Sequence, residues 1–324
     1  MLQAVKAIGW EVAEYGVAQV SMNLDDYRVT PPHVAFEACV ERAQTLNVAV
    51  AGSELVGLIP LQAMLLAADH YIRREKLFIV DERQKVRLVV ERLGLNSVSR
   101  FEPEKRIIEY RIAGGEEEPL AGMSVRGFVE LLGSRTAAPG GGSASALIAG
   151  LGAALGAMVG WMTYGKRKFE AQDPTMRELI PPLHAAMLEL IPMIDADTRA
   201  FNDYMSALGL PKETGEEQAV RHAAMQAGLQ AAVRVPLGVM RLADRCWDAM
   251  IGMAHHGNIA SRSDLEVAAK ALETGIFGAQ RNVLINLDPI ENEAFCQATA
   301  GEAKVLRERA RERLDEVLGI LESR

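Results

Sequence analysis

The stretch from Thr136 to Gly165 constrains the fold most, because it carries no charged side chain. It opens with Ala-Ala-Pro-Gly-Gly-Gly-Ser at 137–143 and continues in small apolar residues, with glycine at every fourth position over 152–160. Glycines permit positive φ angles and close approach of a ligand, and the free N–H groups of a helix start form an anion site. Ser143 is expected to cap this helix. The sequence predicts an anion-holding turn leading into a tightly packed helix.

A membrane span is the alternative interpretation of this stretch. About 20 apolar residues cross a bilayer, and a small residue at every fourth position also suits paired membrane helices. The stretch is nevertheless rich in Gly and Ala rather than Leu, and its first third is a turn. We therefore expect a buried helix of a soluble protein and no membrane partner.

Composition limits the class of protein further. A chain of 324 residues with 49% hydrophobic residues fits about two domains. The net charge of −8 argues against a nucleic-acid partner. Cys39, Cys246 and Cys296 are scattered and few, which favours free thiols, a reducing compartment and a cytoplasmic location. No spacing indicates a metal site, and the N-terminus shows no signal-peptide pattern.

The first domain is predicted to span residues 1–112 and to be a small α/β domain. Apolar runs at 5–12 and 17–22 surround Tyr15-Gly16 and predict a hairpin. The remaining predicted elements are a helix from Pro31-Pro32 to about Leu46, a strand at 48–50, a helix from Pro60 and a helix over about 84–93. The order is ββαβαα, and a lone sheet of this kind leaves an open edge.

A polar, glycine-rich linker is predicted at 113–119, and an all-helical bundle over 120–324. Helical periodicity covers 124–133, 143–164, 173–208, 215–256, 263–284 and 290–322. The expected fold class is a truncated α/β domain followed by a helical bundle.

Two carboxylates lie on the predicted helix through 187–208. Asp197 falls about 60° from the centre of the apolar stripe and Asp195 about 100° away, so Asp197 should face the interior. A buried carboxylate needs a partner or a ligand, and a salt bridge to a neighbouring helix is an equal alternative. Lys212, after this helix, can pair with a ligand carboxylate or simply complement the helix dipole.

Further candidates lie near 262–286. Arg262 can hold an anion, and Asp264 falls in the first turn of a predicted helix. Asn282 and Asn286 lie one turn apart in an otherwise apolar segment. Buried amides must find hydrogen bonds, and either a heterocycle or a neighbouring helix can provide them.

These motifs, in this order, resemble the formiminotransferase-cyclodeaminase family over about its C-terminal two-thirds. The matching segments of the second half are 138–143, 162–166, 195–201, 210–212, 262–270 and 282–286. In the first half, 18–23, 52–57 and 106–110 resemble the end of the family's formiminotransferase C-terminal subdomain.

The resemblance implies a formimidoyltetrahydrofolate cyclodeaminase, an ammonia-lyase that closes the ring of 5-formiminotetrahydrofolate to 5,10-methenyltetrahydrofolate. The folate is then the substrate, with no tightly bound cofactor, and the enzyme a homodimer or larger, since folate sites in this family form between subunits. Asp197 and Asp264 are the candidate acid and base. The candidate substrate-binding residues are Gly140, Gly141, Gly142, Ser143, Lys166, Asp195, Lys212, Arg262, Asn282 and Asn286. The glycine turn, Lys166 and Lys212 are expected to hold the polyglutamate tail.

The resemblance also leads us to expect an incomplete formiminotransferase. The family's N-terminal transferase subdomain, with its catalytic histidine, does not precede Met1. We therefore expect no formimino transfer by this chain alone, and a first domain that acts as a scaffold or pairs with a separate N-terminal subdomain. Two alternatives stay open: a methenyltetrahydrofolate cyclohydrolase, and a non-catalytic subunit that docks on a complete enzyme.

Overall fold

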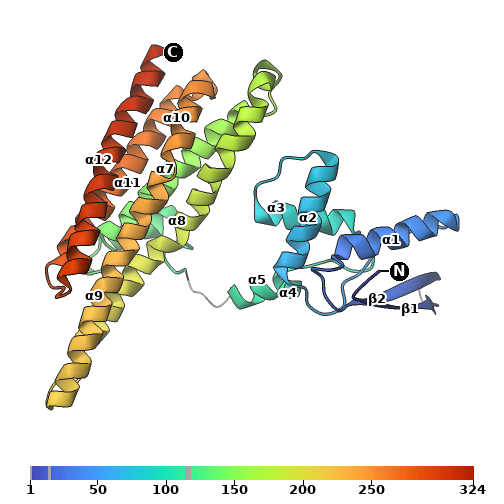
Figure 1. The fold of residues 1–324 in the computed structure, drawn as a ribbon, viewed down its shortest axis with the longest axis horizontal. Coiled ribbons are helices and arrows are strands. Elements are labelled where there is room, and N and C mark those ends of the chain that lie inside the picture. Colours follow the sequence, from blue (N-terminus) through green and yellow to red (C-terminus); the bar gives the residue numbers. More distant parts are fainter. Residues whose placement is uncertain (1, 14–15, 114–117) are drawn as a thin grey trace. The chain divides into compact units, whose positions relative to one another are not determined.

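The chain forms two compact units, Met1–Glu117 and Glu118–Arg324. The structure, a computed structural model, describes residues 2–13, 16–113 and 118–324 (Figure 1). Four residues of the predicted linker, 114–117, therefore lie outside the described residues.

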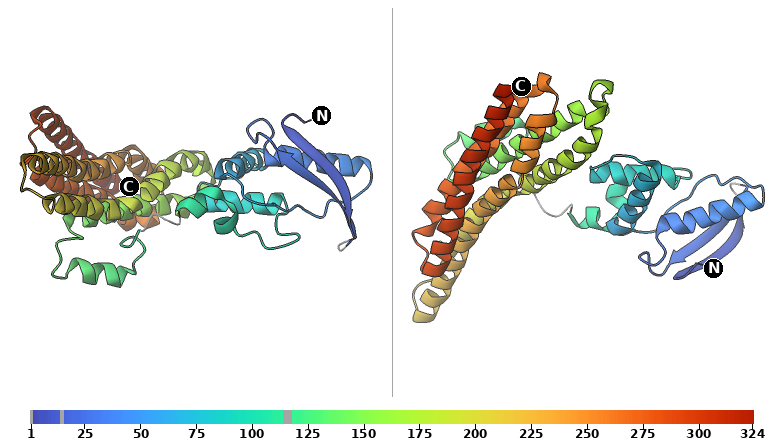
Figure 2. Two further views of the ribbon diagram at one scale, coloured as in Figure 1. Left: turned by 90° about the horizontal axis from the view of Figure 1, so that it is seen from below. Right: turned by 45° about the horizontal axis from the view of Figure 1, so that its top comes forward.

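The first unit opens with an antiparallel hairpin of β1 (Val5–Val12) and β2 (Val17–Leu24), in which Val12 lies opposite Val17. The two predicted strands are confirmed, while Tyr15 of the predicted turn lies outside the described residues. In the described part of the unit the helices are α1 (Pro32–Thr45), α2 (Leu61–Glu75), α3 (Glu82–Arg92), α4 (Pro103–Arg106) and α5 (Ile108–Ala113) (Figure 2). Proline precedes or opens α1, α2 and α4, as its fixed φ favours.

The predicted strand at 48–50 is wrong. Within the described residues the sheet is two-stranded, and 48–50 is an exposed segment outside it. A run of three residues gains little without a neighbouring ladder, and the nearest pairing is an isolated parallel bridge between Ile59 and Ile107. The observed order is thus a hairpin followed by helices, not ββαβαα.

The core of the first unit lies mainly between α2 and α3, where Met64, Tyr71 and Val89 are buried.

The second unit is helical throughout its regular elements. These are α6 (Val125–Leu132), α7 (Gly141–Thr163), the 3₁₀ turn η1 (Arg167–Gln172), α8 (Asp173–Leu208), α9 (Gly215–Asp244), α10 (Trp247–His256), the 3₁₀ turn η2 (Ile259–Ser261), α11 (Arg262–Leu287) and α12 (Glu293–Ser323). One predicted helix, 215–256, is two, because a turn at Arg245 and Cys246 separates α9 from α10. The long helices run beside one another (Figure 1).

The uncharged helix α7 lies between α8 and α11 and packs on both. A Cβ added to Gly152 would lie 2.8 Å from the carbonyl oxygen of Ala268 and 2.9 Å from the amide of Leu272, both on α11. Gly156 and Gly160 meet side chains of α8 and α10 with equally little room. The glycine stripe is therefore used inside the unit and does not by itself call for a second copy.

Length and composition alone would allow two segments, Gly141–Thr163 and Arg167–Leu208, to cross a membrane. The contacts of α7 with α8 and α11 account for its apolar character without a bilayer.

Candidate functional site

The start of α7 meets the middle of α8 at Asp197. One carboxylate oxygen of Asp197 accepts hydrogen bonds from the Ser143 amide at 2.8 Å and from the Ser143 hydroxyl at 3.2 Å. The hydroxyl of Thr198 lies 3.2 Å from that of Ser143. Asp197 thus caps α7 from a neighbouring helix, where a negative charge suits free amides and the helix dipole.

This geometry changes two sequence predictions. The helix begins at Gly141, after Gly140, so Ser143 lies inside its first turn and does not act as its cap. The anion site at the helix start is also already occupied by Asp197, which weakens the prediction that the glycine turn holds an external carboxylate. The salt bridge considered for Asp197 is absent from the described residues, where Ser143 is its partner instead.

Two glycines of the turn make the close approach possible. A Cβ on Gly142 would overlap the carboxylate of Asp197, so only glycine fits opposite this carboxylate. A Cβ on Gly141 would lie 3.4 Å from the amide nitrogen of Asn282. The turn, Asp197 and Asn282 therefore form one cluster, built by α7, α8 and α11.

The environment of Asp197 favours its protonated form. Burial raises the pKa of this half-buried carboxyl above its ordinary value of 3.8, and the hydrogen bonds from Ser143 oppose the rise. Asp197 therefore binds a proton more readily than a surface aspartate does. Such a group can act in general acid or base chemistry.

The two amides of α11 have different surroundings. Asn282 donates to the carbonyl of Gly278 at 2.8 Å, one turn back on its own helix. Its carbonyl oxygen accepts no hydrogen bond within the described part of the chain, so it is available beside the glycine turn. Asn286 donates to the carbonyl of Ala232 on α9 at 3.3 Å, the interhelical bond considered as an alternative to a ligand.

Asp195 holds the chain itself. Its side chain is 2% exposed, and its two oxygens accept from the amides of Leu120 at 2.8 Å and Ala121 at 3.0 Å. Asp197 lies at the margin of the interior, whereas Asp195, at a larger angle from the apolar stripe, is the more buried of the two. The helical-angle argument took account only of the apolar stripe on one face of α8. The segment before α6 packs on a second face of this helix and covers Asp195 there. Both oxygens of Asp195 therefore bind backbone amides of the chain itself, and its role in substrate binding stays a prediction.

A second group of predicted residues lies at the other end of α7. Lys166 is exposed just beyond α7, a helix of 23 residues that is about 34 Å long at a rise of about 1.5 Å per residue. Arg262 and Asp264 lie in the first turn of α11, where Arg262 pairs with Glu266 at 2.6 Å. The backbone amide of Asn258, just before η2, donates to Thr163 at 2.9 Å, which fixes this end of α11 beside the end of α7.

The predicted acid–base pair is therefore divided within one chain. Asp264 and Asn282 share α11, and their separation along it is about 27 Å. Since Asn282 lies in the Asp197 cluster, Asp264 is far from Asp197. Lys212 is exposed beyond the end of α8, so the two lysines predicted to hold one ligand tail lie outside opposite ends of the bundle.

Sequence reasoning missed Thr198 and the segment at 120–121. Thr198 follows Asp197 directly, and no pattern distinguishes it from other helical threonines. Every residue except proline has a backbone amide, so the sequence does not indicate that the amides of 120–121 bind Asp195. Among the described residues no group of three or more His, Cys, Asp or Glu side chains is arranged to hold a metal ion.

Comparison with known proteins gives a consistent result for both units. A family model described as Formiminotransferase-cyclodeaminase matches residues 124–305, and one described as Formiminotransferase domain matches residues 1–113. The second match gives no support to the expectation that the first unit is truncated.

Individual relatives resemble the whole chain or its second half. A formimidoyltransferase-cyclodeaminase of Dictyostelium discoideum is 57% identical over all of this chain, which spans 60% of that relative. A methenyltetrahydrofolate cyclohydrolase of Methylorubrum extorquens is 33% identical over 56% of this chain and 88% of its own. The crystal structure of a formiminotetrahydrofolate cyclodeaminase from Thermotoga maritima is 26% identical, with a TM-score of 0.56 over 62% of this chain and 97% of its own.

The glycine turn, Asp197 and Asn282 all lie within the matched range 124–305, which covers more than half of the sequence. The chain belongs to the formiminotransferase-cyclodeaminase family.

Proposed function

We propose that the second unit is a formimidoyltetrahydrofolate cyclodeaminase. In this reaction N10 of 5-formiminotetrahydrofolate attacks the formimino carbon and loses its proton. The C–N bond to the formimino nitrogen then breaks, that nitrogen takes up protons and leaves as ammonia, and 5,10-methenyltetrahydrofolate remains. The observation that carries the proposal is Asp197, a carboxyl with a raised pKa held at the start of α7 beside Asn282.

Asp197 suits the proton transfers that this reaction needs. One of its oxygens is fixed by Ser143, which orients the carboxyl, and burial raises its pKa above the ordinary value of 3.8, which favours uptake of a proton. The amide of Asn282 can orient the pterin ring by hydrogen bonds, because its carbonyl oxygen is available. The folate is the substrate, and the proposed reaction needs no resident cofactor.

A direct assay separates this proposal from the cyclohydrolase alternative, which the Methylorubrum extorquens relative favours by its name. The purified chain is given 5-formiminotetrahydrofolate, and ammonia and methenyl absorbance are followed together. Cyclodeaminase activity releases ammonia and increases the methenyl absorbance at the same time. Loss of methenyl absorbance from added 5,10-methenyltetrahydrofolate, without ammonia release from the formimino substrate, identifies the cyclohydrolase and contradicts the proposal.

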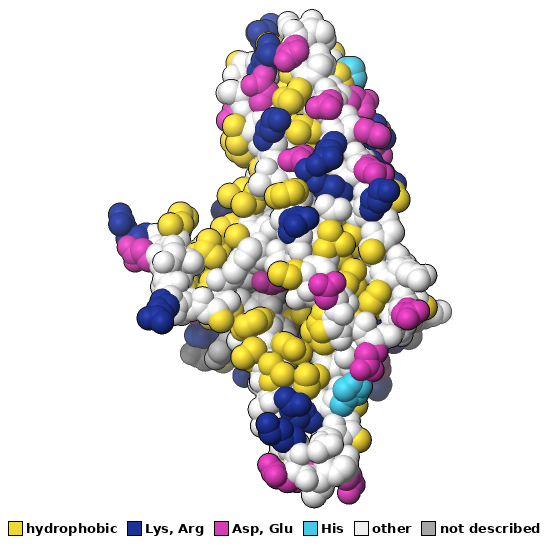
Figure 3. All heavy atoms as spheres, turned by 90° about the vertical axis from the view of Figure 1, so that its left-hand side faces the viewer, with side chains coloured by type: hydrophobic (Ala, Val, Ile, Leu, Met, Phe, Trp, Pro, Cys, Tyr) yellow, Lys and Arg dark blue, Asp and Glu magenta, His cyan; other side chains and the backbone are white. Residues whose placement is uncertain are grey.

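We propose in addition that the active enzyme is a homo-oligomer in which two copies complete the site. The supporting observation is that Asp197 and Asp264 belong to opposite ends of the bundle, so a second copy packed head to tail would bring its Asp264 end to this Asp197. Large apolar side chains are available for such packing, because α11 exposes Val267, Phe277 and Ile285. Hydrophobic side chains also gather between charged ones on the face drawn in Figure 3.

Complementation between inactive variants tests the shared site. Asp197→Asn and Asp264→Asn are each expected to be inactive, and mixing them after dissociation should restore part of the activity in hybrid assemblies. Light scattering measures the oligomeric state in parallel. A fully active monomer, or the absence of any recovery in proven hybrids, would contradict the shared site while leaving the cyclodeaminase assay unaffected.

For the first unit we propose that formimino transfer needs a further protein segment that packs on the hairpin. The hairpin supports this, because Ile8, Trp10 and Val20 are about half exposed or more. The match to a formiminotransferase domain makes transfer itself the function to test. The chain is assayed with formiminoglutamate and tetrahydrofolate, alone and with an N-terminal formiminotransferase subdomain from a relative.

Transfer only after the addition supports this proposal, and transfer by the chain alone contradicts it. A chain inactive in both reactions would favour the docking-subunit alternative.

The free thiols of Cys39, Cys246 and Cys296 support a reducing, cytoplasmic location, which fractionation of cells would test.

A further inference from the structure

A groove of about 530 Å³ lies in the first unit between α3 and the loop that follows it. Its polar lining consists of Arg83 and Arg87 on α3, and Asn96 and Arg100 on the loop. The two α3 arginines are one helical turn apart and so face the same side. Val90 and Phe101, both less than a tenth exposed, add an apolar floor.

The positive charge of this groove is poorly compensated. Arg87 pairs with Glu91 at 3.0 Å, but Arg83 and Arg100 form no ion pair within the described residues. The neighbouring carboxylates form their closest contacts outside the groove: Glu82 accepts from Tyr110 at 3.0 Å, and Glu102 pairs with Lys105 at 2.9 Å while Arg100 attracts it only through space.

The remaining polar group also donates. The carbonyl oxygen of Asn96 accepts from the amide of Phe101 at 2.8 Å, which folds the loop and directs this oxygen to the backbone. The two N–H groups of Asn96 are then left for the groove. Every polar side chain of the lining therefore offers donors, a pattern that suits an acceptor-rich anion.

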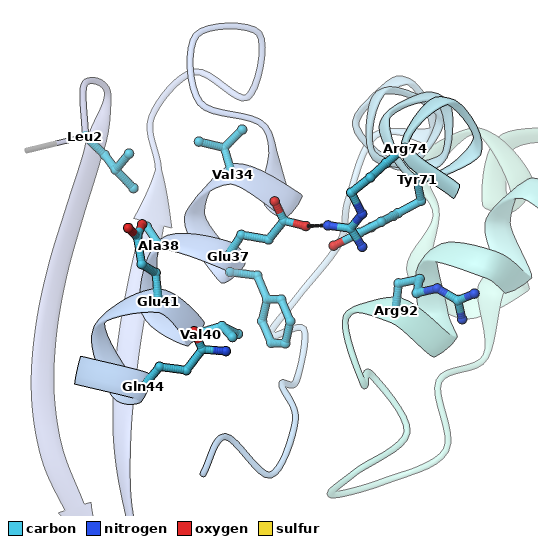
Figure 4. A pocket seen from close by; sticks show the side chains of 11 residues that line it. Leu2, Val34, Glu37, Ala38, Val40, Glu41, Gln44, Tyr71, Arg74 and Arg92 are labelled. Atoms are coloured by element: carbon cyan, nitrogen blue, oxygen red, sulfur yellow. Dashed lines mark hydrogen bonds and ion pairs between the residues drawn. The ribbon is translucent and has the colours of Figure 1, made fainter. Parts of the chain in front are cut away.

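Another cavity of the same unit, of about 660 Å³, is lined by arginines whose charge is compensated (Figure 4). Its arginines are neutralised, because Arg74 pairs with Glu37 and Arg92 pairs with Glu75 at 2.6 Å. The arginines of that cavity are thus matched by carboxylates, whereas Arg83 and Arg100 of the groove at α3 form no ion pair within the described residues.

We propose that the groove at α3 is a binding site for a small polyanion, a molecule that carries two or more carboxylates or phosphates. Guanidinium groups bind either anion through paired N–H donors, and three of them at separate positions suit several charged groups better than one. The net charge of −8 over the whole chain disfavours a long nucleic acid at this site. The proposal is independent of the cyclodeaminase reaction, because the groove lies in the other unit.

Titration calorimetry on the full chain at low salt tests the proposal, with inorganic tripolyphosphate and citrate as probes and acetate as the monovalent comparison. Tripolyphosphate, citrate or both should bind, more tightly than acetate, and which one binds identifies phosphate or carboxylate as the preferred group. The double variant Arg83→Ala with Arg100→Ala should weaken binding about tenfold, since each exposed charge contributes modestly.

Matched variants distinguish the groove from general surface charge. Arg111→Ala removes an exposed arginine of the same unit that does not line the groove, and it should leave the affinity within about twofold. The double variant Arg83→Lys with Arg100→Lys keeps the charge and should retain most of the binding. Circular dichroism checks that all variants fold. Equal affinity in the double alanine variant and in Arg111→Ala, or binding no tighter than that of acetate, overturns the proposal.

Discussion

At the scale of single residues, the position of the Asp197 carboxylate depends on the absence of a side chain at Gly142. The absence of a side chain at 142 gives the Asp197 carboxylate its place at the start of α7, and Ser143 fixes one of its oxygens. The proposed chemistry therefore depends on the missing side chain at Gly142 as well as on the carboxyl of Asp197.

The first residue-scale prediction concerns Asp197→Asn. The substitution keeps size and an oxygen acceptor for Ser143 but removes the exchangeable proton, so turnover should fall by about 10²-fold or more with the fold retained. Ammonia release measures turnover. Asp203→Asn is the matched control, an exposed aspartate on the same helix, and it should leave the rate unchanged. An Asp197→Asn enzyme with the wild-type rate and a lower melting temperature would identify a structural carboxylate.

The pH dependence of stability follows from the same group. The folded-state pKa of Asp197 is raised above 3.8, so the fold favours the protonated form. Its favourable contribution is complete below the unfolded value and is lost as the pH rises through the raised pKa. Relative to wild type, Asp197→Asn should therefore melt at a progressively higher temperature as the pH rises from about 4 through the raised pKa. A difference that shrinks over this interval would contradict the raised pKa.

The second residue-scale prediction compares two glycines of one turn. Gly142→Ala forces a methyl group against Asp197 and should cost about 1–3 kcal/mol of stability as well as most of the activity. Gly140→Ala adds a methyl group where nothing described lies within 4 Å, and should change stability by no more than about 0.5 kcal/mol. Denaturant unfolding and the ammonia assay measure both variants, and equal effects would contradict this account.

At the scale of elements, the periodicity of the sequence predicts helices well because each long helix buries one apolar stripe. α8 and the hairpin strands follow the expected positions closely. The failures have a common cause, which is contact between segments distant in sequence. Residues 48–50 lack a partner strand, and Asp195 is buried by a segment far before it.

The element-scale prediction concerns packing of α7 on α11. Gly152→Ala places a methyl group against backbone atoms of α11, which cannot rotate away, and should destabilise the unit by about 1–3 kcal/mol. For a unit of this size, that lowers the melting temperature by about 2–4 °C per kcal/mol. Gly301→Ala in α12, where nothing described lies within 4 Å, should instead stabilise by about 0.5–1 kcal/mol. Calorimetry decides, and a harmless Gly152→Ala would contradict the packing.

At the scale of the whole molecule, sequence motifs gave the family but not the grouping of its residues. The segments at 138–143, 195–201 and 282–286 converge, whereas those at 162–166 and 262–270 meet at the other end of α7. Because α7, α8 and α11 alternate in direction, only the three-dimensional packing assigns each motif to an end. The roles of these residues stay predictions until the variants above are measured.

The whole-molecule prediction is that residues 118–324 fold and work alone. This segment includes the amides of Leu120 and Ala121 that bind Asp195, together with the complete Asp197 cluster. It should unfold cooperatively and release ammonia within about twofold of the full chain, because its contacts are internal. A matched piece that starts at 122 should be less stable, since it loses the two backbone amides that bind Asp195 and the apolar burial of Leu120. An inactive but folded 118–324 would show that the first unit is needed for catalysis.

The contact between Gly142 and Asp197 also has an evolutionary consequence. A side chain at position 142 and a carboxylate at position 197 cannot occupy the same space, so neither position can drift independently of the other. Across related sequences, any change at 142 to a larger residue should occur together with a smaller residue at 197. Such pairs would identify relatives that have lost the carboxylate at this end of the bundle.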